Sequence, residues 1–119
     1  MPRRLPFQPA ETAIQAAVVD HWLALGRPNT LVAAIPNARA AGQPGLTKGL
    51  PDLLVLGGLV GVGLLELKTL TGEPSDEQIA VRAICERARV ACEIVAGRDA
   101  PIDVLERWGV VRPRAGRAA

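Results

Sequence analysis

The sequence KGLPDLLVLGGLVGVGLLELK, from Lys48 to Lys68, decides the fold of this chain. It contains two apolar runs separated by a glycine-rich turn, which is typical of two buried strands joined as a hairpin. Three charged residues, Asp52, Glu66 and Lys68, lie at the ends of these runs. A charge buried in such a place is costly unless it is paired or bound to a metal. These three residues are therefore the first candidates for a functional site.

The predicted hairpin indicates where these side chains point. We expect antiparallel strands over residues 52–56 and 62–68, paired so that residue 52 lies opposite residue 66. Because side chains alternate between the two faces of a strand, Glu66 and Lys68 share one face. In this register Asp52 joins them there. A slip of one residue would move Glu66 to the other face, so the convergence depends on the register.

Length and composition predict one domain with an aliphatic core. The chain has 119 residues, of which 49% are hydrophobic and only 3% aromatic, enough for a single modest core. We assign residues 1–10 to an N-terminal arm and residues 11–109 to the folded domain. Residues 110–119 form a basic tail that we expect to be disordered, either as a solubilising end or as an arm that contacts phosphate.

No segment of the sequence predicts export or a membrane span. The first residues, MPRRLPFQPAE, lack the long apolar run of a signal peptide. The longest apolar stretch, residues 53–65, is short and interrupted by glycines. Cys85 and Cys92 lie within apolar patterns, as expected of reduced thiols in a cytosolic core. We therefore expect a cytoplasmic protein that does not contact a membrane.

Charge is distributed unevenly along the chain. The formal net charge is +2, but six arginines lie near the two ends, and residues 5–106 carry eight basic and twelve acidic residues. Residues 5–106 therefore have a net negative charge and do not form a generally basic surface for nucleic acid. An anionic partner would have to be held by local cationic clusters, by the arginine-rich ends, or by metal ions that offset the carboxylates.

Further helices and strands are predicted on both sides of the hairpin. They are a helix over 11–25, a strand over 30–35, a helix from 75 to about 90, a strand over 92–96 and a helix over 99–109. Ser75 and Gln78 form a capping box at the start of the second helix, and Asp99 is expected to cap the third. The order predicts an α/β fold, a small mixed β-sheet with flanking helices, in which the second helix connects two parallel strands.

Two residues on the predicted helices are further candidates for the site. Glu11 lies at the N-terminal extension of the buried stripe of the first helix, either as an acid favoured by the helix dipole or as part of a site. Gln78 lies on the inward face of the second helix. Its capping role explains it fully, and a second role in the site is the alternative.

The loop over residues 36–51 is unusually long for a small domain, and such loops often have a function. It carries Asn37, Arg39 and Lys48. Asn37 could cap a turn and the two cations could simply be solvated. Because the loop leads directly into Asp52, we expect these residues to lie near the carboxylates and to contact nucleic acid.

Asp52, Glu66 and Lys68 together form a pattern typical of metal-assisted phosphodiester hydrolysis. Carboxylates suit Mg²⁺ or Mn²⁺, whose remaining ligands come from water and substrate phosphate. Such a metal activates water and neutralises charge, and Lys68 can hold the water or the phosphate oxygens. The chain has no zinc ligand set and no Walker loop, so we expect neither zinc nor a nucleotide cofactor.

These motifs resemble the VRR-NUC family of the PD-(D/E)XK nuclease superfamily, whose core has the order αβββαβ. The resemblance rests on Gly49-Leu50-Pro51-Asp52, on Glu66-Leu67-Lys68, and on Gly72 followed by Ser75 and Gln78. It also includes Glu11 and Pro36-Asn37, and covers roughly residues 11–108. A proline-aspartate followed by ExK is a short pattern, and the added helix start makes the match more specific.

The resemblance implies both an activity and roles for the site residues. It implies a stand-alone, phage-type endodeoxyribonuclease of DNA repair that cuts branched DNA, such as flaps or Holliday junctions, as a homodimer. The setting would be a bacterial or phage-infected host cell. The implied metal ligands are Glu11, Asp52, Glu66 and the Leu67 carbonyl, and the implied catalytic residues are Asp52, Glu66, Lys68 and Gln78.

Two other functions are compatible with the same fold. One is a catalytically silent nucleic-acid-binding or assembly module, and the other is a structural domain with a buried ion pair between Glu66 and Lys68. A silent copy has no reason to keep buried charges. The structural alternative leaves Asp52 unexplained. The nuclease is therefore the leading hypothesis.

Overall fold

The computed structural model describes residues 10–36 and 44–115. Its helices and strands follow the predicted order: α1 (Glu11–Leu25), β1 (Leu31–Ala34), β2 (Leu53–Gly57), β3 (Gly61–Lys68), α2 (Asp76–Arg87), β4 (Ala91–Ala96) and α3 (Asp99–Arg107). Within the described ranges, no helix has the length and apolar character needed to cross a membrane.

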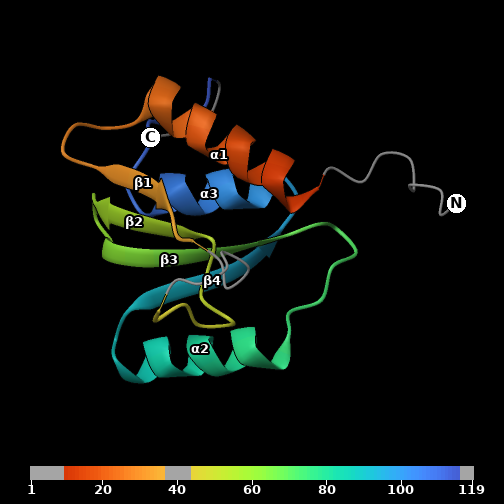
Figure 1. Ribbon diagram of the computed structural model, residues 1–119. Helices are drawn as coiled ribbons and strands as arrows, with labels where there is room; N and C mark the ends of the chain where they lie inside the picture. The colour runs from red at the N-terminus through yellow and green to blue at the C-terminus, as the bar shows by residue number, and fades with distance from the viewer. Residues whose placement is uncertain (1–9, 37–43, 116–119) are drawn as a thin grey trace, which may run out of the picture.

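The four strands form one mixed sheet in the order β1-β2-β3-β4. β1 pairs with β2 and β2 with β3 in antiparallel fashion, whereas β3 and β4 are parallel. α2 connects the parallel pair and lies alone on one face of the sheet, while α1 and α3 cover the other face (Figure 1). The predicted fold class, an α/β fold with a small mixed sheet and flanking helices, is confirmed.

The core lies between the sheet and the helices α1 and α3. Alternate residues of β2 and β3 point into it, as the period of a strand requires. Its fully buried members include Leu53, Val55, Leu65, Leu67, Val18 and Leu105. Because Leu65 and Leu67 point towards these helices, Glu66 and Lys68 point to the face that carries α2.

The predicted register of the hairpin is confirmed. Gly57 pairs with Gly61 and Leu53 with Leu65, so Asp52, one residue before β2, comes opposite Glu66. Gly57 and Gly61 have φ values of 93° and 73°, a backbone conformation that glycine adopts at little cost. The turn glycines therefore support the register that brings the charged residues together.

The start of α3 differs from the prediction. Asp99 does not cap the helix but is its first residue, and the N-cap is Arg98, which makes no side-chain capping bond. The chain turns out of β4 at Gly97, whose φ is 84°. Arg98 already has helical angles after this tight turn, so the helix begins one residue earlier than its capping signal indicated.

The C-terminal segment is also better ordered than the sequence predicted. Val110 and Val111 were assigned to a disordered tail, yet their exposed fractions are 0% and 1%. The Val110 carbonyl accepts a hydrogen bond from the Arg27 amide at 2.9 Å, and the Arg112 amide donates to the Leu25 carbonyl at 2.8 Å. The two valines thus join the core beside the end of α1. Residues 116–119 lie outside the described part of the chain.

Arg114 continues this attachment to α3. Its guanidinium donates to the Glu106 carboxylate at 2.9 Å and also contacts the Asp103 carboxylate. The basic residues near the C-terminus are therefore partly used within the fold. The prediction that the chain is disordered from residue 110 onwards is wrong for residues 110–115. These residues pack against the apolar core and form hydrogen bonds with α3 and with the end of α1.

Candidate metal centre

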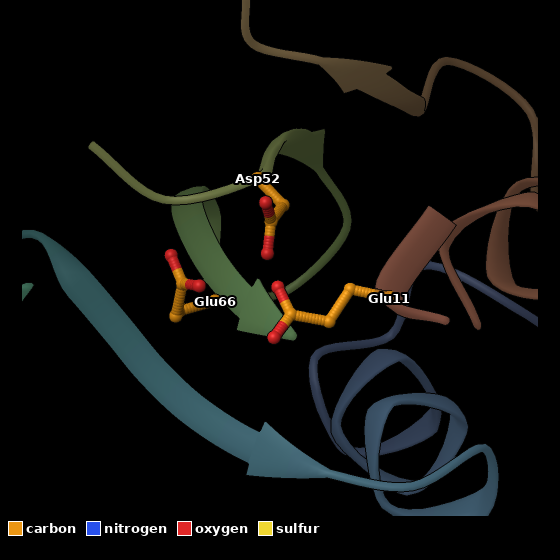
Figure 2. Close-up of side chains that lie close together, drawn as sticks. All are labelled: Glu11, Asp52 and Glu66. Atoms are coloured by element: carbon orange, nitrogen blue, oxygen red, sulfur yellow. The ribbon is translucent and has the colours of Figure 1, made fainter. Parts of the chain in front are cut away.

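Three carboxylates from distant parts of the sequence meet beside the end of β3. Glu11 is the first residue of α1, Asp52 directly precedes β2, and Glu66 lies in β3. One oxygen from each lies within 4.8 Å of the other two. Figure 2 shows the three side chains directed towards a common space. The structure therefore brings together three of the residues that the sequence proposed as metal ligands.

Asp52 is held by both its backbone and its side chain. Its carbonyl accepts a hydrogen bond from the Ile35 amide at 2.8 Å, which ties it to the end of β1. Its Oδ2 accepts a hydrogen bond from the Leu67 amide at 2.7 Å. The preceding residue, Pro51, is buried. These contacts fix the position of the Asp52 carboxylate beside Glu66.

The Leu67 carbonyl faces the same side of β3 as Asp52. The amide and carbonyl of one strand residue point to the same neighbouring strand, and successive residues alternate. The Lys68 carbonyl accepts a hydrogen bond from the Gly97 amide at 2.9 Å, so Lys68 faces β4. Leu67 must then face the opposite way, where its amide already meets Asp52. This orientation is compatible with the expected role of the Leu67 carbonyl as a ligand.

Glu66 is the most deeply buried acid of the group, with an exposed fraction of 2%. Its Oε2 accepts a hydrogen bond from the Gln78 side chain at 2.9 Å. Its Oε1 is buried and has no hydrogen-bond partner among the described residues. Burial, followed by the charge of Asp52, raises the pKa of Glu66 to about 8, although Lys68 lowers it. A buried oxygen without a donor, in a cluster of carboxylates, fits a divalent cation.

Gln78 makes the contacts of a helix cap and also contacts one of the three carboxylates. Its side-chain oxygen accepts a hydrogen bond from the Ser75 amide at 2.9 Å, and its own amide donates to the Ser75 hydroxyl at 3.1 Å. This completes the capping box of α2. The side-chain nitrogen remains and donates to Glu66 at 2.9 Å. One glutamine thus starts the helix and orients a candidate metal ligand.

Lys68 is the cation of the cluster. Its ammonium lies 3.6 Å from Glu66 Oε2 and 3.9 Å from Glu11 Oε2, and its side chain is 11% exposed. The register of β3 directs Lys68 and Glu66 to the same face. A compact ammonium in this position partly compensates the negative charge and can also bind an incoming anion.

Comparison of the sequence with protein-family models and with curated proteins finds no match. Comparison of the structure finds a "VRR_NUC domain" with a TM-score of 0.63 and 19% identity, covering 82% of this chain and 96% of that one. A "VRR_NUC domain protein" matches with a TM-score of 0.69 and 17% identity, covering 94% of this chain and 100% of that one. The chain has the VRR_NUC fold. The resemblance inferred from the motifs is confirmed at the level of the fold.

The residues expected to contact nucleic acid all come from the stretch of sequence between β1 and β2. Asn37 and Arg39 fall outside the described residues. Lys48 is described and is exposed. The next residue, Gly49, has a φ of 93°, and a Cβ added to it would lie 2.5 Å from the Glu77 carbonyl. At Gly49 the chain therefore packs against the first turn of α2, which carries Gln78.

Sequence reasoning missed two features of the site. It treated Leu67 only as a carbonyl ligand, whereas the Leu67 amide also fixes Asp52. It also passed over Gly97, whose amide donates to the Lys68 carbonyl, and Arg98, the residue that follows it. A glycine and an arginine directly after a strand were the available signal, but only the parallel pairing of β3 and β4 places them at the site.

Proposed function

We propose that this protein is a divalent-metal-dependent endodeoxyribonuclease that hydrolyses phosphodiester bonds. The observation that carries the proposal is the convergence of Glu11, Asp52 and Glu66 beside Lys68, on a VRR_NUC fold. The burial of Glu66 and Lys68 argues against a silent module, because charges held in this way lower stability unless they are used.

The proposed ligands are the carboxylates of Glu11, Asp52 and Glu66 and the carbonyl of Leu67. Oxygen donors of this kind select Mg²⁺ or Mn²⁺. When bound, such a metal supplies an activated water molecule and neutralises charge on the phosphate. No soft ligand is part of the group, so zinc is not the proposed metal.

The side chains of the site have separate roles in this proposal. Lys68 holds the attacking water or the phosphate oxygens as charge develops on them. Gln78 keeps Glu66 in place through its 2.9 Å hydrogen bond. The Leu67 amide does the same for Asp52 at 2.7 Å. Both contacts come from the protein itself and orient two of the proposed ligands.

The proposed substrate is branched DNA, such as flaps or Holliday junctions, as the motif resemblance implies. Three acids close together repel a phosphate backbone, so binding needs both the metal and local cations. Lys48, directly before the contact of Gly49 with α2, is the described candidate for such a cation. Arg39 and Asn37 remain proposed contacts from the same stretch of sequence.

The test is cleavage of linear duplex, flap and four-way junction DNA side by side with Mn²⁺. We expect cleavage of the branched substrates, and none when the metal is removed with EDTA. Lys68→Ala should abolish cleavage but retain DNA binding, and Asp52→Asn should abolish cleavage. Arg87→Ala, in the last turn of α2, is a surface control that should remain active.

The outcomes separate the parts of the proposal. Absence of cleavage on all three DNAs would contradict the nuclease, and robust cutting by Asp52→Asn would contradict the metal centre. Equal cutting of all three substrates would contradict only the preference for branched DNA, and not the nuclease activity or the metal centre.

We also propose that the protein is a homodimer. On the α2 face of the sheet, Leu31 pairs with Leu56 and Leu56 with Val62, which forms an apolar row across three strands. Leu31 and Val62 are 41% and 47% exposed, and Ile84 of α2 is 58% exposed. A second copy that covers this surface with the same residues would form a symmetric contact and bury apolar area on both chains.

A further inference from the structure

Two chain segments meet beside Lys68 at the candidate metal centre. One is the loop over 69–75 between β3 and α2, and the other is the turn over 97–98 between β4 and α3. The Gly97 amide donates to the Lys68 carbonyl at 2.9 Å. A Leu70 methyl carbon lies 2.9 Å from the position that a Cβ on Gly97 would take. The turn is therefore held against the Lys68 backbone and Leu70, and the next residue is Arg98.

The backbone of Arg98 has helical angles, but its side-chain charge has no partner in the described part of the chain. Its φ and ψ are −94° and −29°, and it is exposed. It forms no ion pair with a described carboxylate. The neighbouring acid, Asp99, lies 3.9 Å from the Arg114 guanidinium. The adjacent negative charge is thus directed towards another arginine.

Other arginines of this part of the fold are already paired. Arg107 donates to Glu93 at 2.8 Å, and Arg114 donates to Glu106 at 2.9 Å. Because both guanidinium groups already bind carboxylates of the domain, they are less able to bind a ligand. Arg98 differs because it combines a free charge with a position one residue from a direct backbone contact to Lys68.

A phosphate backbone that enters this site needs positive charge beside the three carboxylates. The guanidinium of arginine matches the oxygens of a phosphate and can donate two parallel hydrogen bonds to them. We propose that Arg98 binds a backbone phosphate of the DNA strand that enters the metal centre. This inference rests on the proposed function and adds a DNA contact on the β4 side of the site, whereas Lys48 lies on the loop before β2.

The test is DNA binding by fluorescence anisotropy over a range of salt concentrations, with Ca²⁺ as the divalent cation. Loss of one phosphate contact lowers the slope of log affinity against log salt by about 1, and we expect Arg98→Ala to weaken binding roughly tenfold. Arg98→Lys should recover part of the affinity, because it keeps the charge. Mn²⁺ affinity by calorimetry and the melting temperature should not change, since Arg98 is not a metal ligand or a core residue.

The matched control is Arg112→Ala. Arg112 is exposed and its amide bonds to Leu25 at the far end of α1, roughly 20 Å along the helix from Glu11. It should alter binding little. Unchanged affinity and slope in Arg98→Ala, or equal losses in both variants, would overturn the inference.

The behaviour of the wild-type protein separates this inference from the proposed function. Binding without cleavage would contradict the nuclease, while a selective loss in Arg98→Ala would still support the phosphate contact. Absence of DNA binding by the wild type would overturn both.

Discussion

Glu66 is a buried acid whose ionisation affects the stability of the folded protein. Burial and the charge of Asp52 raise the pKa of Glu66 from 4.5 to about 8. Between pH 4.5 and pH 8, in the absence of metal, Glu66 keeps its proton in the folded protein but has lost it in the unfolded chain. The folded state then binds more protons than the unfolded state. The contribution of this group to stability is therefore fully present below about pH 4.5 and is lost as the pH rises through 8.

This linkage predicts a pH-dependent melting temperature in EDTA. The wild-type protein should lose stability between pH 5 and pH 9 more steeply than Glu66→Gln, which cannot ionise. At pH 9 the variant should melt at the higher temperature, because it avoids a buried, incompletely paired carboxylate. Thermal unfolding followed by circular dichroism measures both curves. Parallel curves for the two proteins would show that Glu66 does not titrate in this way.

At the scale of the element, the start of α2 links local helix formation to the site. Ser75 and Gln78 satisfy the amides of the first turn, as capping boxes do. The same turn supports the loop at Gly49 and holds Glu66 through Gln78. A change in this turn therefore affects both the stability of the helix and the geometry of the carboxylates.

Two substitutions of Gln78 separate these effects. Gln78→Ala removes the reciprocal cap and should lower the free energy of unfolding by about 1 kcal/mol. Gln78→Glu retains an acceptor for the Ser75 amide, because glutamate also completes a capping box. It replaces the donor to Glu66 with an acid, so it should cost less stability than Gln78→Ala and still reduce cleavage.

Chemical denaturation and cleavage rates, measured on the same preparations, provide the comparison. If Gln78→Glu cleaves DNA as fast as the wild type, the hydrogen bond to Glu66 has no functional role. If its rate falls only in proportion to its stability, the capping box alone explains Gln78.

At the scale of the whole molecule, the two faces of the sheet are covered unequally. α1 and α3 share one face, with the fully buried core beneath them, whereas α2 alone covers the other (Figure 1). The apolar row of Leu31, Leu56 and Val62 lies on this second face. Exposed apolar patches of this kind are common at protein interfaces.

The dimer proposed from this surface can be tested with two matched helix substitutions. Ile84→Glu in α2 introduces a charge at a position that is 58% exposed, and Leu23→Glu in α1 does so at one that is 68% exposed on the opposite face. Light scattering at micromolar concentration should give a dimer for the wild type and Leu23→Glu, and a monomer for Ile84→Glu. A monomeric wild type would contradict the dimer, and a dimeric Ile84→Glu would contradict the surface.

Much of this architecture follows from signals within short stretches of sequence. The two apolar runs and the turn glycines between them determine the hairpin and its register, which place Asp52, Glu66 and Lys68 on one face. The serine and glutamine spacing determines where α2 begins. These features are local because strand alternation, turn angles and helix caps depend on neighbouring residues.

Only the tertiary structure decided which distant residues reach the site. The helical pattern indicates which face of α1 is buried, but the packing of α1 against the sheet brings Glu11 to the carboxylates. The pairing of β3 with β4 likewise brings Gly97, the residue before Arg98, against the Lys68 carbonyl, and tertiary packing makes Val110 part of the core. Contacts of this kind depend on the sum of many weak interactions between separate elements, which no single stretch of sequence encodes.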